Sequence, residues 1–165
     1  MSLLKLCQWL QDQPLSNSLR ESTNAYPMIE TAHVVSMCLF LGLVFMMDLR
    51  LAGIGNLRTP FSELQKRTFP WQMLGLALSS ISGTVLFYTE PLRFYSNIFF
   101  WIKNVGLVLA CVNALAFHLT TYHSVAAWDS DPKPPLRARL AGALSLVLWA
   151  VVVMSGRLIA YNWFK

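Results

Sequence analysis

The sequence predicts an all-α, polytopic membrane protein, in which four transmembrane helices form a bundle and an N-terminal amphipathic helix lies at the membrane interface. Hydrophobic residues make up 55% of the 165 residues and charged residues 13%, whereas about a quarter of an average soluble domain is charged. Four apolar runs each approach the roughly 20 residues that a helix needs to cross a bilayer. This composition excludes an ordinary water-soluble domain, and the 3 cysteines exclude a disulfide scaffold.

The four spans are separated by segments rich in proline and charge. We place the spans at about 28–50, 70–88, 98–122 and 140–161, within a transmembrane domain of residues 25–165. Proline stands in the breaks, where it is typical of a helix end. Pro70 is expected in the first turn of the second span, and Ser96 or Asn97 is expected to cap the third.

Residues 1–24 are predicted to be an amphipathic, interfacial segment. Polar residues interrupt its apolar run and no small-residue cleavage site follows, so it does not read as a cleaved secretory signal. We expect a helix up to Pro14 that lies on the membrane surface, with Trp9 at the interface. The apolar residues that share one face of it are Leu3, Leu6, Cys7 and Leu10.

The basic residues predict the orientation. The loops after the first and third spans carry seven lysines and arginines, and the opposite side carries four. The positive-inside rule then predicts a multi-pass protein of the bacterial inner membrane with both termini in the periplasm. We interpret the net charge of +5 as a sign of membrane topology. It does not indicate nucleic-acid binding, because the basic residues are scattered between apolar runs.

Ionisable side chains inside the predicted spans indicate a functional site. Placing such a group in the membrane costs about 2.5–3.5 kcal/mol on insertion scales, so its presence indicates a function. These side chains are Glu30, His33, Asp48, Lys103, His118 and Arg157. A rise of about 1.5 Å per residue places most of them in the outer half of the bilayer and only Asp48 and His118 toward the inner half.

The outer group has an excess of positive charge. Glu30 balances only one of Lys103 and Arg157, and an anionic ligand would balance the other. Haem b is one candidate, because its propionates need cations and its iron needs an axial nitrogen such as that of His33. A quinone head group, polarised by Lys103 or Arg157 and protonated through Glu30, is another. No ligand is needed if both cations extend to the outer interface and Glu30 pairs with one of them.

His33 and His118 are not expected to hold one haem within a single chain. Their predicted depths differ by roughly 20 Å, far more than the separation of two axial nitrogens. Either His33 is the only protein ligand, or Lys103 is the second, or His118 belongs to a separate inner site. A homo-oligomer would also bring histidines of two chains together.

Copper is the alternative metal. Met37 and Cys38 follow His33 by about one turn, and soft sulfur ligands select Cu(I). Methionine is also an ordinary filler of apolar helices. The sequence has no CxxC, HExxH or phosphate-loop motif, so hydrolytic, ATP-driven and thiol–disulfide chemistry have no support.

Three short segments resemble a known superfamily of small bacterial four-helix membrane proteins. They are Glu30-Thr-Ala-His33-Val-Val, Asp48-Leu-Arg50-Leu and Phe100-Trp101-Ile-Lys103. The superfamily includes copper-resistance D-type (CopD-like) proteins, the haem-containing HemJ-type protoporphyrinogen oxidases and an uncharacterised integral-membrane family, to which this chain is most similar. The resemblance implies that His33 takes part in haem b binding, and that Arg50 and Lys103 match an arginine and a lysine of the oxidase branch. Where that branch typically has a proline before the arginine, this chain has Asp48.

The sequence therefore predicts a haem b-binding inner-membrane protein of electron transfer, with a quinone or a redox protein as its partner. It would be an oxidoreductase or a subunit of one. The alternatives are a copper-uptake or copper-resistance protein and a non-catalytic structural or accessory subunit. The predicted cofactor residues are His33, which would also bind the metal, and Glu30, Lys103, Arg157, Arg50 and His118.

Overall fold

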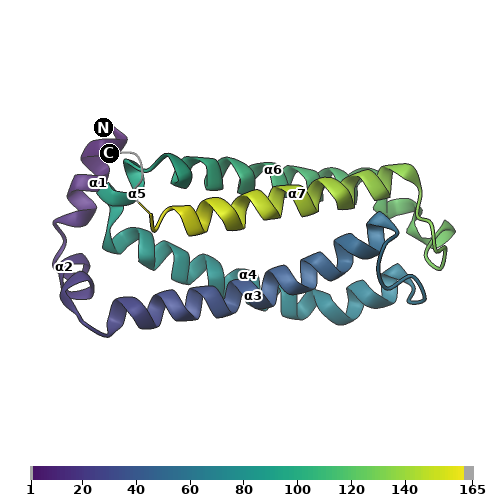
Figure 1. Ribbon diagram of the computed structural model, residues 1–165, viewed down its shortest axis with the longest axis horizontal. Helices are drawn as coiled ribbons and strands as arrows, with labels where there is room; N and C mark the ends of the chain where they lie inside the picture. The colour runs from purple at the N-terminus through teal and green to yellow at the C-terminus, as the bar shows by residue number, and fades with distance from the viewer. Residues whose placement is uncertain (1, 162–165) are drawn as a thin grey trace.

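The computed structural model describes residues 2–161, and this part of the chain is helical with no β-strand (Figure 1). The helices are α1 (Leu3–Gln11), α2 (Pro14–Glu21), α3 (Ala25–Ala52), α4 (Phe61–Thr89), α5 (Pro91–Tyr95), α6 (Ile98–Thr120), the 3₁₀ helix η1 (Tyr122–Ala127) and α7 (Leu136–Leu158). Four of them are long and run along the length of the molecule, whereas α1, α2 and α5 gather at one end and η1 lies at the other.

Three of the long helices indicate a membrane protein. Helices α3, α6 and α7 are each long and apolar enough to cross a bilayer. Much of their apolar surface is exposed, which is consistent with contact with lipid. On α6 this outward surface includes Val105, Val108, Val112, Leu115 and Leu119. Helix α4 has 29 residues but begins with a more polar stretch.

The helix ends agree with the sequence in one place and differ in another. Asn97 caps α6, because its side chain accepts a hydrogen bond from the Phe99 amide at 2.9 Å. Helix α4, however, begins at Phe61, so the expectation that Pro70 stands in its first turn is wrong. A proline inside a helix costs about 3 kcal/mol. The packing of residues that precede Pro70 in α4 offsets this cost, since Phe61 and Leu64 are buried.

The start of α4 is also held by a distant carboxylate. Asp129 accepts hydrogen bonds from the backbone amide of Ser62 at 2.7 Å and from its hydroxyl at 2.6 Å. A carboxylate is favourable at this position because the amides of a helix N-terminus lack partners within the helix. The buried cluster next to it consists of Leu51, Phe61, Phe117, Val125, Trp128 and Ala138.

The N-terminal segment folds across the opposite end of the bundle. Helix α1 contacts α5, with Cys7 buried and Leu3 and Trp9 exposed. The fully buried Ser16 of α2 donates its hydroxyl proton to the carbonyl of Tyr88 at 2.9 Å. This bond attaches α2 to the last turn of α4.

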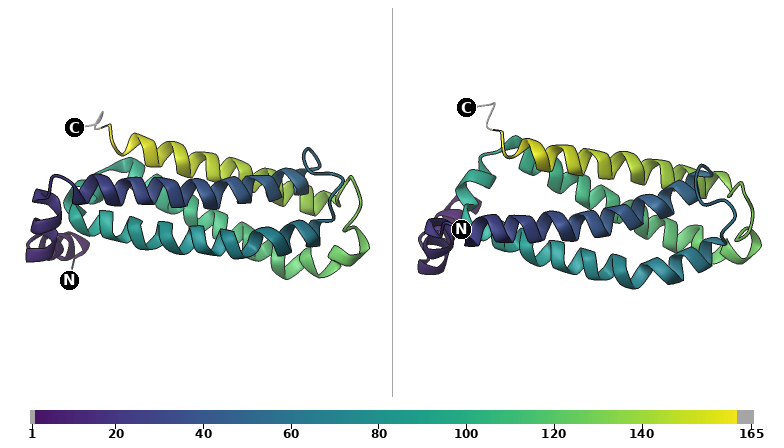
Figure 2. Two further views of the ribbon diagram at one scale, coloured as in Figure 1. Left: turned by 90° about the horizontal axis from the view of Figure 1, so that it is seen from below. Right: turned by 60° about the horizontal axis from the view of Figure 1, so that its bottom comes forward.

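The four long helices pack side by side in the order α4, α3, α7, α6 (Figure 2). Helix α3 packs against α4 on one side and α7 on the other, and α7 packs against α6. Within the described part of the chain, α4 and α6 make no comparable contact. The row α4–α3–α7–α6 therefore leaves a cleft between α4 and α6, and the cavities described below lie in it.

Two glycines allow the neighbours of α3 to approach its backbone. A Cβ on Gly75 of α4 would lie 2.9 Å from the Phe40 nitrogen and 3.0 Å from the Ser36 oxygen. A Cβ on Gly142 of α7 would lie 2.8 Å from both the Asp48 carbonyl oxygen and the Leu51 Cβ. These distances are shorter than ordinary van der Waals contacts, so no larger residue fits without moving α3.

Gly142→Ala is expected to lower the free energy of unfolding by about 1–3 kcal/mol, because the added methyl group would collide with the backbone of α3. Gly42→Ala is the matched control, since a Cβ there meets nothing within 4 Å. Thermal unfolding in detergent would compare the two variants. Equal unfolding midpoints for both would contradict the close approach.

Candidate functional site

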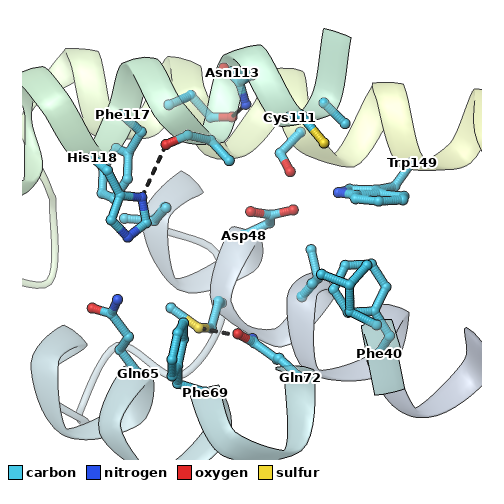
Figure 3. Close-up of a pocket in the computed structure, with 18 of the residues that line it drawn as sticks. Phe40, Asp48, Gln65, Phe69, Gln72, Cys111, Asn113, Phe117, His118 and Trp149 are labelled. Carbon is cyan, nitrogen blue, oxygen red and sulfur yellow. Dashed lines mark hydrogen bonds between the residues drawn. The ribbon is translucent and has the colours of Figure 1, made fainter. Parts of the chain in front are cut away.

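Two cavities lie in the cleft, each lined by residues of all four long helices. The first, which we call the His33 cavity, has a volume of about 380 Å³ and is lined by His33, Met37 and Lys103 among others. The second, the Asp48 cavity, has a volume of about 260 Å³ (Figure 3). Phe40, Leu76 and Trp149 line both cavities and so form the wall between them. The rings of Phe40 and Trp149 meet edge to face, with their centroids 5.1 Å apart.

The His33 ring is oriented by Ser82 of α4. The Ser82 hydroxyl donates its one hydrogen bond to the Leu78 carbonyl at 2.6 Å, so its oxygen accepts a hydrogen bond from His33 Nδ1 at 3.0 Å. This tautomer leaves the lone pair of Nε2 for a ligand or metal. Gly83 makes room for the ring, because a Cβ there would lie 3.0 Å from His33 Cε1.

Lys103 of α6 brings a positive charge to the same cavity. Its side chain is half-buried and passes near Gly156, where a Cβ would lie 3.8 Å from Lys103 Cδ. In the described residues no carboxylate forms an ion pair with it. An ammonium group in these surroundings favours an anionic or electron-rich ligand.

The other two residues of the predicted outer group lie outside this cavity. Glu30 is exposed and, as far as the structure describes the chain, forms no ion pair with Lys103 or Arg157. Arg157 is exposed and donates a hydrogen bond to the Tyr161 hydroxyl at 2.9 Å, with its guanidinium 5.2 Å from the centre of that ring. The structure thus brings His33 and Lys103 together, but not Glu30 or Arg157.

Arg50 lies at the far end of α3 and is fully buried, with 0% of its surface exposed. Its guanidinium donates hydrogen bonds to the carbonyls of Thr59, Asp129 and Asp131 at 2.9, 3.0 and 3.1 Å. These carbonyls belong to the two loops at the η1 end of the bundle. The observed contacts of Arg50 therefore join those loops, and Arg50 lines neither cavity.

His118 lines the Asp48 cavity and not the His33 cavity. Its Nδ1 lies 3.0 Å from the Ala114 carbonyl oxygen, and its ring stacks on Tyr122 with centroids 5.1 Å apart. His33 and His118 therefore line different cavities.

Sequence reasoning noted Asp48 but gave it no role. Asp48 is buried, with 7% of its surface exposed, and its Oδ2 has no hydrogen-bond partner in the described structure. Gln65 and Gln72 of α4 line the same cavity. Asp48 and Gln72 stand out in the sequence as polar residues inside apolar runs, whereas Gln65 lies before the expected second span and carries no such signal.

The described residues form no site made of several histidine, cysteine or carboxylate ligands. Among the described residues no group of three or more such side chains is close enough together to hold a metal ion. Cys38 is exposed and lines neither cavity, and Cys111 lines the Asp48 cavity. A metal at His33 would thus rely on this histidine with Met37, Lys103 or a non-protein ligand.

The described part of the chain is an all-helical protein with three helices that are long and apolar enough to cross a membrane. The cleft between α4 and α6 contains two cavities. Residues 23–162 match the model described as "Family of unknown function (DUF6644)", and the chain belongs to this family. No curated protein and no solved structure matches the chain.

Arg50→Lys is expected to lower the free energy of unfolding by about 3 kcal/mol, because an ammonium group cannot reach the three carbonyls that the guanidinium holds. Chemical unfolding of protein prepared without added cofactor would measure the loss. Arg58→Lys is the control, since Arg58 is exposed on one of the same loops. If Arg50→Lys were as stable as the wild type, the loop contacts would not be the role of Arg50.

Proposed function

We propose that this chain is a haem b-binding membrane protein of electron transfer, and that the His33 cavity holds the haem. One observation carries the proposal: His33, whose Nδ1 bonds to Ser82, shares a cavity with Lys103, which forms no ion pair among the described residues. The volume of about 380 Å³ falls within the roughly 300–1,000 Å³ of ligand pockets.

The residues present fit such a group. His33 would be an axial ligand, and Lys103 would either pair with a propionate or serve as the second ligand. Haem, when bound, supplies one-electron redox chemistry. Asn104 and the apolar walls of Phe87 and Phe100 line the same cavity and would keep the group out of water. The proposed site is narrower than the set expected from the sequence, because Glu30, Arg157, Arg50 and His118 do not line this cavity.

We further propose that a quinone or a redox protein exchanges electrons with this site, which would make the chain an oxidoreductase or a subunit of one. The cleft between α4 and α6 favours an apolar partner such as a quinone, because such a molecule dissolves in the bilayer. A homo-oligomer would offer the site a second histidine from another chain. The resemblance to the CopD-like and HemJ-type superfamily belongs to the same proposal.

The membrane arrangement is part of the proposal as well. We take α4 as a transmembrane helix in addition to α3, α6 and α7. Its residues Glu63, Lys66 and Arg67 would lie at the membrane interface, where Glu63 and Arg67 pair with each other. Helices α1 and α2 would lie on the surface of the membrane, with the exposed Trp9 in the headgroup region. The distribution of lysine and arginine favours the bacterial inner membrane with both termini in the periplasm.

His33→Ala is expected to abolish haem binding, because the variant removes the axial nitrogen. The measurement is the Soret absorption of detergent-purified protein that was expressed with added haem. His123→Ala is the control, since His123 is exposed and lines neither cavity. Wild-type protein without a Soret band, or a His33→Ala variant with full haem content, would refute the proposal.

Copper binding is the second candidate, and Met37 favours it, because this thioether lines the same cavity as His33. After loading with Cu(I), the wild type is expected to retain at least one equivalent. Replacing Met37 and Cys38 together is expected to lower that amount. A wild type that retains neither copper nor haem would instead favour a structural or accessory subunit.

A further inference from the structure

The Asp48 cavity is not used by the proposed function, and two of its hydrogen-bond acceptors have no donor. The carboxylate oxygen Oδ2 of Asp48 and the amide oxygen Oε1 of Gln65 are both buried, and neither has a hydrogen-bond partner within the described chain. Both atoms accept hydrogen bonds, and both side chains line this cavity (Figure 3). Burying an acceptor without a donor costs about 1–3 kcal/mol, so two in one cavity indicate a missing donor.

Several donors that line this cavity are already engaged. Gln72 Nε2 donates to the sulfur of Met47 at 3.1 Å, and Asn113 Nδ2 donates to the Ala141 carbonyl at 2.9 Å. His118 Nδ1 lies 3.0 Å from the Ala114 carbonyl, which can only accept, so Nδ1 carries a proton. In neutral His118, Nε2 is then one more acceptor. The indole N–H of Trp149 and the amide nitrogen of Gln65 line the cavity as well, but neither bonds to Asp48 Oδ2 or Gln65 Oε1 in the described structure.

The carboxyl group of Asp48 has no ion-pair partner in the described residues either. Arg50 is the nearest arginine in the sequence, and its Nε and Nη2 donate to the carbonyls of Thr59, Asp129 and Asp131. Its buried Nη1 has no partner in the described structure, but Arg50 does not line this cavity. No ion pair to Asp48 is found in residues 2–161, and only the Ser145 hydroxyl interacts with its carboxylate. An unpaired buried carboxylate is strongly unfavourable.

The rest of the wall fits an organic cation. The aromatic rings of Phe40, Phe69, Phe117 and Trp149 line the cavity around Asp48. Aromatic faces attract cations, and more strongly where water is excluded. An ammonium group has only hydrogen-bond donors and so complements the free acceptors, whereas an apolar body would occupy the aromatic walls.

We propose that the Asp48 cavity binds a small organic ammonium compound with an apolar or aromatic body. Its N–H groups bond to Asp48 and Gln65, and its body packs against Phe40, Phe69 and Trp149. The ammonium can come from a free amine or from a lipid headgroup that carries a primary amine. This site is independent of haem at His33, so either proposal can fail alone.

Equilibrium dialysis of radiolabelled 2-phenylethylamine against the detergent-purified full chain tests this site. Saturable binding is expected for the wild type, and Asp48→Asn, which keeps the shape of the side chain, is expected to weaken it at least about 10-fold. Glu63→Gln removes a carboxylate of an exposed pair with Arg67 and is expected to bind like the wild type. Absence of saturable binding to the wild type, or equal binding to Asp48→Asn, would overturn the proposal.

A second comparison does not depend on the folding of a variant. 2-Phenylethanol has nearly the same shape but no charge, and it is expected to compete at least about 10-fold more weakly than unlabelled amine. Equal competition would show that the cavity recognises only the apolar body. Displacement by sodium chloride, but not by choline chloride at the same ionic strength, would make an inorganic cation the occupant and would equally overturn the proposal.

The source of the ammonium follows from competition in nanodiscs. If phosphatidylethanolamine displaces the labelled amine and phosphatidylglycerol does not, the occupant is a lipid headgroup. If neither lipid displaces it, the occupant is a free amine. Both results support the ammonium site, whereas displacement by phosphatidylglycerol alone would contradict it.

Discussion

The arrangement of the whole bundle depends on the close contact that α3 makes with two other helices. Gly75 and Gly142 let α4 and α7 approach the backbone of α3, so that no side chain separates the helices at these points. Helix α3 is thereby fixed between α4 and α7, and α6 is added on the far side of α7. Helices α4 and α6 become the two ends of the row, and the cleft between them contains both cavities.

The helices were predictable where the signals are local. A helix occupies or overlaps each of the four apolar ranges, and Asn97 caps α6 as its side-chain chemistry requires. The start of α4 was not predictable in this way. Pro70 is a local stop signal, but Phe61 is buried in a cluster with Phe117 and Trp128, and Asp129 bonds to the first turn of α4. These partners are distant in sequence and outweigh the local preference of proline.

The depth of the candidate-site residues in the bundle was predictable, but the direction in which their side chains point was not. Counting residues along a helix places His33 and Lys103 at similar depths, and the structure shows them in one cavity. The same count places Glu30 and Arg157 nearby, yet both are exposed, because depth does not say which way a side chain faces. Arg50 shows another limit: its observed partners are carbonyls of two loops, which a pattern of residue types does not reveal.

The aromatic pair of Phe40 and Trp149 separates a cavity that contains a lysine from one that contains an aspartate. The two rings stand between the amine of Lys103 and the carboxyl group of Asp48, so the cleft is divided into two compartments with opposite kinds of polar group. A basic side chain lines one compartment and an acidic side chain lines the other, while the same two aromatic residues belong to both walls.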